Sequence, residues 1–213
     1  MYRPAAFDVA ELDAMFDMVD DAAFGHLVTS GPDGFASTSL PFLVDREHGS
    51  SGRLRGHLAR ANPHWRTIQG ASTLVIFPLA DGYVSPAWYP SKAEHGKVVP
   101  TWNYELVHVH GTVRIHDDPA WVRTLVTDLT DRHETARSAP PARWQVTDAP
   151  TDFIDKQLRA IVGVEVEIWS IEAKRKLSQN RPEDDRNGVE AALATSERSG
   201  DLEVADAMRR NRR

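Results

Sequence analysis

The segment "GHLARANPHW", residues 56–65, concentrates hydrogen-bonding groups where an apolar strand is expected to run into a helix. A phosphate is bound well by an arginine or lysine side chain together with free backbone N–H groups at the start of a helix. Arg60 and the N–H groups near Asn62 supply both kinds of donor. This pattern therefore predicts a site for a phosphorylated ligand at the turn.

A flat, conjugated ring would need aromatic walls and, at its edge, groups that both donate and accept hydrogen bonds. Gln179 and Asn180 carry such amide groups. The alternative is that the tryptophans only fill the core, and Trp144 and Trp169 are expected to be structural in this way. The candidate walls are Trp65, Trp88, Trp102 and Tyr104.

Other chemistries find less support in the residues. The chain has no cysteine, which excludes disulfides, thiolate metal sites and a cysteine nucleophile. The common hydrolase, nucleotide-binding and zinc-protease motifs are also missing. His108 and His110 lie two apart on one expected strand face, and His57 could be close to them, so a histidine-only metal site and a haem site stay open as alternatives. No carboxylate has a ligand-like spacing beside them, so no metal site is predicted.

The elements that must position these groups are mainly strands. Apolar and polar residues alternate from Thr101 to His116, which predicts one long strand with Val107, Val109 and Val113 on one face. The "GPDG" sequence at 31–34 predicts a turn that joins two paired strands. Further extended segments are expected at 24–29, 35–44, 54–58, 73–78, 83–88 and 162–171, with a loop at 90–100.

Helices are expected where a capping residue precedes an amphipathic pattern. Asp8 is expected to cap the first helix, Asp118 with Pro119 a second, and Thr151 a third. A short helix is expected at 63–69, and a helical tail from about residue 182, where the exposed acids 183–185 favour a helix start. This order of elements indicates a mainly β, α+β protein: an antiparallel barrel with flanking helices.

The bulk composition narrows the class of protein. With 213 residues, 41% hydrophobic and 26% charged, the chain suits one soluble domain or one domain with a small appendage. No apolar run reaches the roughly 20 residues of a membrane span, and acids near the N-terminus argue against a signal peptide, so a cytoplasmic protein is expected.

The net charge of −6 argues against a dedicated DNA-binding face. The late basic residues are expected to be solvated helix ends, with contact to a phosphate backbone as the alternative. These residues are Lys174, Arg175, Lys176, Arg209, Arg210, Arg212 and Arg213.

Several segments, in this order, resemble the PaiB-type FMN-binding negative transcriptional regulators: "MYRPAAF", "GHLARANPHW", "YVSPAWY", "VPTWNYELVHVHGTVRI", "AIVGVEVEI" and "KRKLSQN". The resemblance runs from about residue 1 to about residue 208. That family is part of the flavin-binding split-barrel group, which includes the pyridoxamine phosphate oxidase-like proteins. The resemblance implies a split β-barrel that forms a homodimer, with FMN at the subunit interface and contacts from both subunits.

Mapped onto this chain, the resemblance assigns the residues of an FMN site. Arg60 would be the main charge partner of the phosphate, and Trp102 and Asn103 would lie near the ring. The "KLSQN" segment at 176–180 would close the site from the partner subunit. Many relatives have a histidine at the position of Ser39, which keeps hydrogen bonding but cannot carry charge near neutral pH. The expected FMN-binding residues are Thr38, Ser39, His57, Ala59, Arg60, Asn62, Trp65, Trp102, Asn103, Lys176, Ser178, Gln179 and Asn180.

Three functions remain open at this point. The first is an FMN-binding regulator or flavin-dependent sensor with a split-barrel domain at 1–180 and a helical extension at 181–213. The second is a flavin-dependent oxidoreductase that uses the same pocket, which would need open space over the ring and a nicotinamide site. The third is a repressor that binds DNA directly, which would need the C-terminal arginines of two subunits to lie together.

Overall fold

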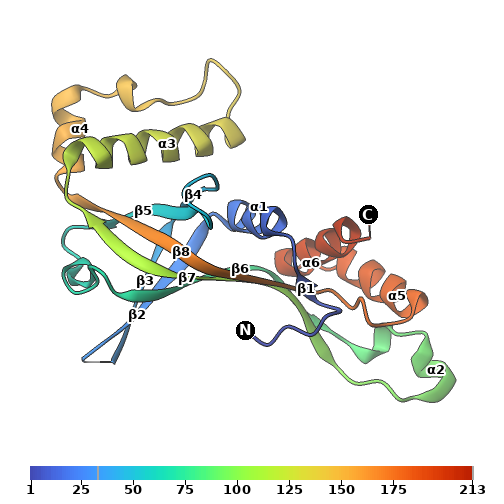
Figure 1. Ribbon diagram of the computed structural model, residues 1–213. Helices are drawn as coiled ribbons and strands as arrows, with labels where there is room; N and C mark the ends of the chain where they lie inside the picture. Colours follow the sequence, from blue (N-terminus) through green and yellow to red (C-terminus); the bar gives the residue numbers. More distant parts are fainter. Residues whose placement is uncertain (33, 213) are drawn as a thin grey trace. The chain divides into compact units, whose positions relative to one another are not determined.

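The fold centres on one large antiparallel sheet, in the computed structural model that describes residues 1–32 and 34–212. The strands follow the order β3-β2-β6-β7-β8-β5-β4, with the short β1 paired to β8. Within the described residues the sheet does not close on itself, which is compatible with a split barrel (Figure 1). The strands are β1 Asp8–Val9, β2 Phe24–Gly31, β3 Gly34–Pro41, β4 Leu43–Asp45, β5 Arg53–Ala59, β6 Ser72–Val84, β7 Thr101–His116 and β8 Ile161–Lys176.

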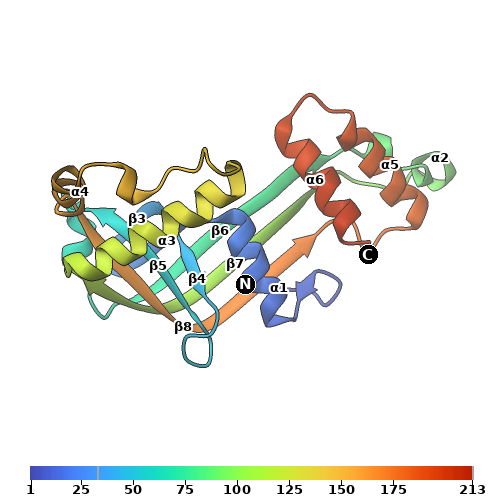
Figure 2. The same ribbon diagram turned by 90° about the horizontal axis from the view of Figure 1, so that it is seen from above.

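Six α-helices accompany the sheet in the described part of the chain. In Figures 1 and 2, α3 lies along the sheet beside β5, and α5 and α6 lie side by side near the end of the chain. None of the helices among the described residues has the length and apolar character needed to cross a membrane. The helices are α1 Leu12–Ala22, α2 Ser91–His95, α3 Pro119–Arg137, α4 Thr151–Leu158, α5 Glu183–Ala194 and α6 Ser199–Arg210; the 3₁₀ turns are η1 Pro63–Arg66, η2 Pro86–Trp88 and η3 Val146–Asp148.

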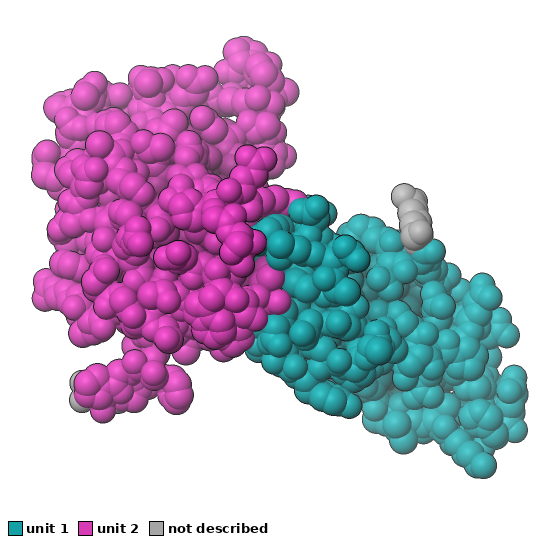
Figure 3. All heavy atoms as spheres, viewed as in Figure 1, with its two compact units in different colours: residues 1–21, 78–108, 172–213 teal, residues 22–77, 109–171 magenta. Residues whose placement is uncertain are grey.

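The chain divides into two compact units, coloured separately in Figure 3. Unit 1 consists of residues 1–21, 78–108 and 172–213, and unit 2 consists of residues 22–77 and 109–171. The helical tail expected from about residue 182 is confirmed as α5 and α6, both of which belong to unit 1. A domain boundary at residue 180 stays a prediction.

Unit 2 contains most of the barrel and its core. The β2–β3 hairpin pairs Leu27 with Thr38, and β5 pairs Leu54 with Val166, so alternate side chains of each strand point into one interior. Phe42 and Phe77 meet edge to face at 5.7 Å inside it. Helix α3 packs on the sheet as a second layer. Its buried residues Leu125 and Leu129 form an apolar cluster with Leu43.

Unit 1 has its own core, in which α5 and α6 supply Val189, Leu193 and Val204. Its polar centre is Asp185, which is only 1% exposed and accepts hydrogen bonds from the backbone N–H (3.1 Å) and the hydroxyl (2.7 Å) of Ser91. The expectation that all three acids at 183–185 are exposed is therefore wrong for Asp185. Its carboxylate ties α5 to the start of α2.

Most expected elements are present, and the differences have local causes. The strand from Thr101 to His116 and the cap at Asp118, whose carboxylate accepts the Ala120 N–H at 3.0 Å, are confirmed. The expected cap at Asp8 is wrong, because Asp8 pairs with Lys174 in β1 and binds Arg3. The helix then starts at Leu12.

The segments expected at 73–78 and 83–88 are joined in one strand, β6, which runs through Pro78 and ends at Val84. The loop expected at 90–100 contains the short helix α2. The helix expected to be capped by Thr151 has Thr151 as its first residue, after Pro150. The turn at 31–34 joins β2 and β3 as expected, with Gly34 at a φ of 105°, although Asp33 lies outside the described residues.

Candidate functional site

A hydrogen-bonded cluster forms in unit 2 where β5 ends and the chain turns into η1. The Asn62 N–H donates to the Ala59 carbonyl at 2.9 Å, which closes the turn. Asn62 then caps η1, because its side-chain oxygen accepts the His64 N–H at 3.0 Å, and Pro63 occupies the first position of the turn. The sequence "NPH" thus fixes both the turn and the direction of the His64 ring.

Thr38 is the centre of this cluster. Its hydroxyl accepts a hydrogen bond from the Asn62 side-chain amide at 3.1 Å and shares another with His64 Nδ1 at 2.8 Å. The other ring nitrogen of His64 shares a hydrogen bond with the Thr29 hydroxyl at 2.8 Å. Burial lowers the pKa of His64 below its ordinary value, so the ring is neutral at pH 7.

The cluster borders a hollow of ≈430 Å³. Its polar lining comes from Ser37, Thr38, Asn62, His64 and Thr67. The volume falls within the range of about 300–1,000 Å³ typical of small-molecule sites. Hydroxyl, amide and imidazole groups converge here from β3 and from the turn after β5, an arrangement suited to a polar, multiply hydrogen-bonded ligand group.

Arg60 lies at the same turn but is directed to Asp117. Its guanidinium donates two hydrogen bonds to the Asp117 carboxylate, one of them at 3.0 Å, and its Nε donates to the Arg159 carbonyl at 2.8 Å. The hydrogen bonds from Arg60 hold the pKa of Asp117 below its ordinary value. Trp65 donates its indole N–H to the Arg60 carbonyl at 2.9 Å and so braces the backbone of the turn.

Thr38 and Ser39 point to opposite faces of β3, as neighbours in a strand must. The Ser39 hydroxyl shares a hydrogen bond with His26 Nδ1 at 2.7 Å, across the β2–β3 pair. Many proteins of the family that this sequence resembles have a histidine at the position of Ser39. In this chain a histidine, His26, lies beside that position on the neighbouring strand. Ser39 is not among the residues that line the Thr38 hollow.

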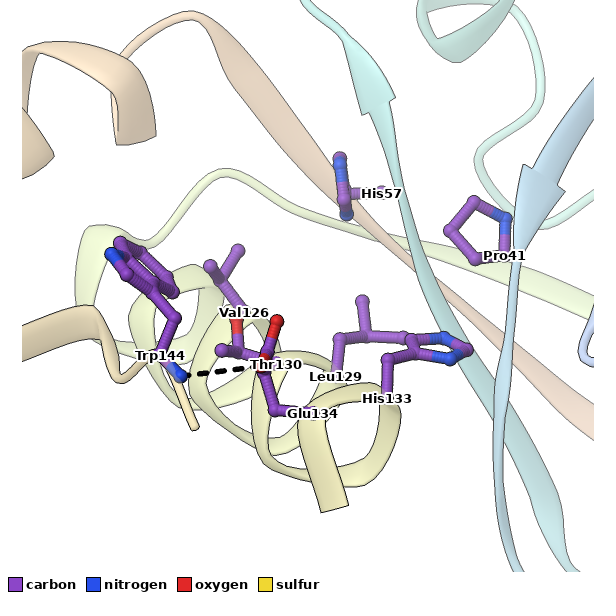
Figure 4. A pocket seen from close by; sticks show the side chains of 8 residues that line it. All are labelled: Pro41, His57, Val126, Leu129, Thr130, His133, Glu134 and Trp144. Atoms are coloured by element: carbon purple, nitrogen blue, oxygen red, sulfur yellow. Dashed lines mark hydrogen bonds between the residues drawn. The ribbon is translucent and has the colours of Figure 1, made fainter. Parts of the chain in front are cut away.

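His57 and Ala59 occupy the opposite face of β5 from the core residues Leu54 and Leu58. Ala59 is exposed at the strand end. His57 lies beneath α3 in a second hollow (Figure 4). Burial lowers the pKa of His57. The structure thus separates His57 from the Thr38 cluster, although both belong to unit 2.

The remaining expected residues all lie in unit 1. Asn103 is completely buried and exchanges hydrogen bonds with the Ser178 hydroxyl at 3.0 and 3.1 Å. Lys176 donates to the Thr101 hydroxyl at 2.8 Å and to the Trp102 carbonyl. These contacts bind the end of β8 to the start of β7 within the unit.

The residues after β8 are held by a local loop. The Gln179 side chain accepts the Leu177 N–H and donates to the Arg175 carbonyl, both at 2.6 Å, while Ser178 has a φ of 64°. Asn180 is exposed. Trp102 is 48% exposed and meets Tyr83 edge to face at 6.0 Å. The Gln179 amide is thus used by the backbone, whereas Trp102 and Asn180 are open to other contacts.

The structure therefore brings the expected residues into two groups, one in each unit. The group in unit 2 contains Thr38, Asn62 and Arg60. The group in unit 1 consists of Trp102, Asn103, Lys176, Ser178, Gln179 and Asn180. Sequence reasoning missed His64, Thr29 and Asp117. The position of His64, two residues after a capping Asn62, was a usable signal, whereas Thr29 and Asp117 become neighbours only through the fold.

The comparisons with known proteins agree with this architecture. The family model described as "Putative FMN-binding domain" matches residues 1–170. The protease synthase and sporulation protein PAI 2 of Bacillus subtilis is 30% identical over 209 residues, which cover 98% of this chain and 96% of that protein.

Two solved structures share the fold. A conserved hypothetical protein of Mycobacterium tuberculosis gives a TM-score of 0.58 at 14% identity and covers 85% of this chain and 94% of its own. An FAD and haem binding protein of Mycobacterium smegmatis has a TM-score of 0.54 at 16% identity. The match covers 79% of this chain and 73% of that protein. At these identities the likeness concerns the split-barrel fold alone.

Proposed function

The chain belongs to the family of FMN-binding domains whose model it matches, and from that membership we propose that it is a PaiB-type flavoprotein acting as an FMN-dependent regulator. FMN, the cofactor expected from the sequence, is the ligand for which the family is described. The regulatory role rests on the resemblance to the PaiB type. The proposed location is the cytoplasm.

The observation that carries the proposal is the hollow beside Thr38, Asn62 and His64. Its hydroxyl and amide groups suit the ribityl and phosphate part of FMN, which is rich in hydrogen-bonding oxygens. The hollow itself has no arginine or lysine among its lining residues. A cation for the phosphate would come from Arg60, at the same turn, or from Arg66, which lies over the Trp65 ring at 5.5 Å.

We further propose that FMN is bound between two copies of the chain. Trp169 is 58% exposed in the middle of β8, where its ring contacts His110 at 5.3 Å, so the packing role expected for it is wrong. Large exposed aromatic side chains on a sheet face are typical of interfaces. Trp102 and Asn180 of a partner subunit would then supply contacts to the flavin that the Thr38 hollow lacks.

Regulation through direct DNA contact is disfavoured by the pairing of the late cations. Arg175 binds Glu105 at 2.8 Å, and Arg209 and Arg212 bind Glu190 at 3.0 and 2.9 Å. Arg213 lies outside the described residues. We therefore place the regulatory effect in an FMN-dependent change of the dimer that another macromolecule recognises.

An oxidoreductase is the second candidate, because one of the structures of the same fold is an FAD and haem binding protein. The same hollow would hold the flavin, and the ring would have to stay open to a nicotinamide or another reductant. A further alternative is that the chain binds haem in place of FMN, and the absorbance spectrum described below separates these two cofactors.

The test begins with an absorbance spectrum and an FMN titration of the purified chain, with the mass of the complex measured by light scattering. A dimer that retains one flavin per chain supports the proposal, and a monomer that retains none contradicts it. A Soret band would indicate haem instead. Oxidation of NADH or NADPH in the presence of bound FMN would favour the oxidoreductase, and its absence the regulator.

A further inference from the structure

A second hollow, of ≈310 Å³, lies within unit 2 under α3 and shares no lining residue with the hollow beside Thr38. In Figure 4, His57 and Pro41 face the side chains of Val126, Leu129 and Thr130 on α3. Trp144 borders it from the segment after α3. The hollow is thus built by two layers of the same unit, at a place that FMN binding through Thr38 and Asn62 does not use.

The lining is largely apolar and contains no arginine or lysine. Pro41, Val126, Leu129 and Trp144 provide apolar surface. The only acid, Glu134, accepts the backbone N–H of Trp144 at 3.2 Å, which holds the tryptophan segment against α3 (dashed line in Figure 4). An anion would meet this carboxylate and no arginine or lysine, and the remaining polar groups of the lining are two histidines and a threonine, so the site favours an uncharged molecule.

His57 supplies the directional group. Its Nδ1 is buried and has no hydrogen-bond partner among the described residues, whereas Nε2 is the nitrogen that remains accessible in the hollow. The neutral ring carries one proton. A buried N–H without an acceptor is rarer in proteins than a buried acceptor without a donor, so the proton belongs on Nε2. His57 therefore presents one hydrogen-bond donor to whatever fills the hollow.

The volume sets the size of the ligand. An enclosed apolar cavity of about 150 Å³ takes up one benzene molecule, and this open hollow of ≈310 Å³ has room for a ligand of about two fused rings. The indole of Trp144 offers a flat wall for them. We propose that the hollow under α3 is a second small-molecule site, which binds an uncharged bicyclic aromatic carbonyl compound whose oxygen accepts a hydrogen bond from His57.

The probe for this site is 1-tetralone, compared with tetralin, which has the same two rings and no carbonyl. Affinities are measured by isothermal titration with the full chain, without FMN and with saturating FMN. We expect 1-tetralone to bind about three- to tenfold more tightly than tetralin, the range that one net hydrogen bond gives. 1-Naphthoate, an anion of similar size, should bind more weakly than either.

Two variants localise the binding. His57→Phe keeps a ring and removes the donor, so it should erase the preference for tetralone and leave the affinity for tetralin within about twofold. Thr130→Phe fills the hollow from α3 and should abolish binding of both compounds. Thr124→Phe is its matched control, because Thr124 lies on the exposed side of the same helix and should leave binding unchanged.

Equal affinity for tetralone in the His57→Phe and unaltered chains would overturn the assigned hydrogen bond. Tighter binding of naphthoate than of tetralone would overturn the ligand class. Displacement of tetralone by FMN would assign this hollow to the flavin and contradict a separate site. Retention of tetralone with no FMN binding at all would instead contradict the proposed function and leave this inference standing.

Discussion

Asp117 holds the guanidinium of Arg60 by two hydrogen bonds, at the residue where β7 has just ended and α3 has not begun. The Arg60 Nε and one terminal nitrogen also donate to the Arg159 and Ile161 carbonyls at 2.8 and 3.2 Å. A phosphate that used Arg60 would therefore have to share it with a carboxylate. This arrangement positions the arginine in advance and at the same time lowers its net positive charge toward a ligand.

Arg60→Ala should weaken FMN binding more than Trp169→Phe does, and Asp117→Asn should keep or strengthen it by releasing the arginine. Arg123→Ala is the matched control, since Arg123 forms a comparable exposed ion pair with Asp155 in the same unit. Loss of either exposed pair should change stability by only about 0–1 kcal/mol. FMN titration by fluorescence quenching is the measurement; equal retention in Arg60→Ala and Arg123→Ala would show that Arg60 does not bind the phosphate.

Thr38→Val should destabilise the protein by about 1–3 kcal/mol, because the Asn62 amide and His64 Nδ1 lose their shared partner. The control is Thr112→Val, at an exposed strand position of β7 in the same unit. Urea unfolding followed by circular dichroism gives both free energies. Thr38→Val should also weaken FMN binding. If Thr38→Val has the same unfolding free energy and the same FMN affinity as Thr112→Val, the central role assigned to Thr38 is wrong.

The free energy of unfolding should fall as the pH is lowered below about 6.5, the ordinary pKa of histidine. Burial lowers the pKa values of both His57 and His64 in the folded protein. The unfolded chain then binds protons that the folded chain does not, so stability present above pH 6.5 is lost as the pH falls toward the folded pKa values. Unfolding curves from pH 8 to 5 test this. The double variant His57→Phe, His64→Gln should reduce the dependence but not abolish it, because burial also lowers the pKa of His116.

Gly163→Ala should cost at least about 1–3 kcal/mol, the usual price of overpacking. A Cβ at this position of β8 would overlap the Trp121 ring, which itself stacks on His116 with centroids 4.0 Å apart. Gly31→Ala is the control, since its Cβ would meet only the Gly34 carbonyl oxygen at 3.9 Å. A thermal shift of the same size in both variants would argue against close packing at Trp121.

Asp185→Ala should destabilise the protein by about 1–3 kcal/mol, because it removes the side-chain acceptor of two hydrogen bonds from Ser91 and leaves those donors without a partner. Asp184→Ala, one residue earlier and exposed, should cost no more than about 1 kcal/mol through the helix dipole. Calorimetry of the two variants separates the roles. Similar losses would mean that Asp185, like its neighbour, acts only on the helix start.

The sequence predicts the framework of this protein well, because the framework depends on local patterns. The strand from Thr101 to His116 shows its alternation directly, and Asp118 with Pro119 is a complete helix start. The prediction for Asp8 is wrong because aspartate is a common helix cap, whereas here Asp8 lies in β1 and pairs with Lys174 of β8, which is distant in the sequence.

The site is predicted in composition more than in geometry. Asn62 is placed by its own turn, and its position next to Pro63 is a local signal. The partners that give Arg60 and Thr38 their roles, Asp117 and His64, are fixed only by the meeting of separate strands. For the same reason Trp169, on an alternating strand, looked like a core residue: periodicity identifies two faces but does not say which one is covered.

Unit 1 is assembled from three separate stretches of chain and unit 2 from two, and the strands β6, β7 and β8 each pass from one unit to the other. No single cut in the gene could therefore release either unit as a continuous fragment. Nearly the whole chain must be synthesised before unit 1 can fold completely, because the last stretch of unit 1 begins at residue 172. Premature termination within this last stretch would therefore leave the core of unit 1 incomplete, although every residue of unit 2 has been synthesised.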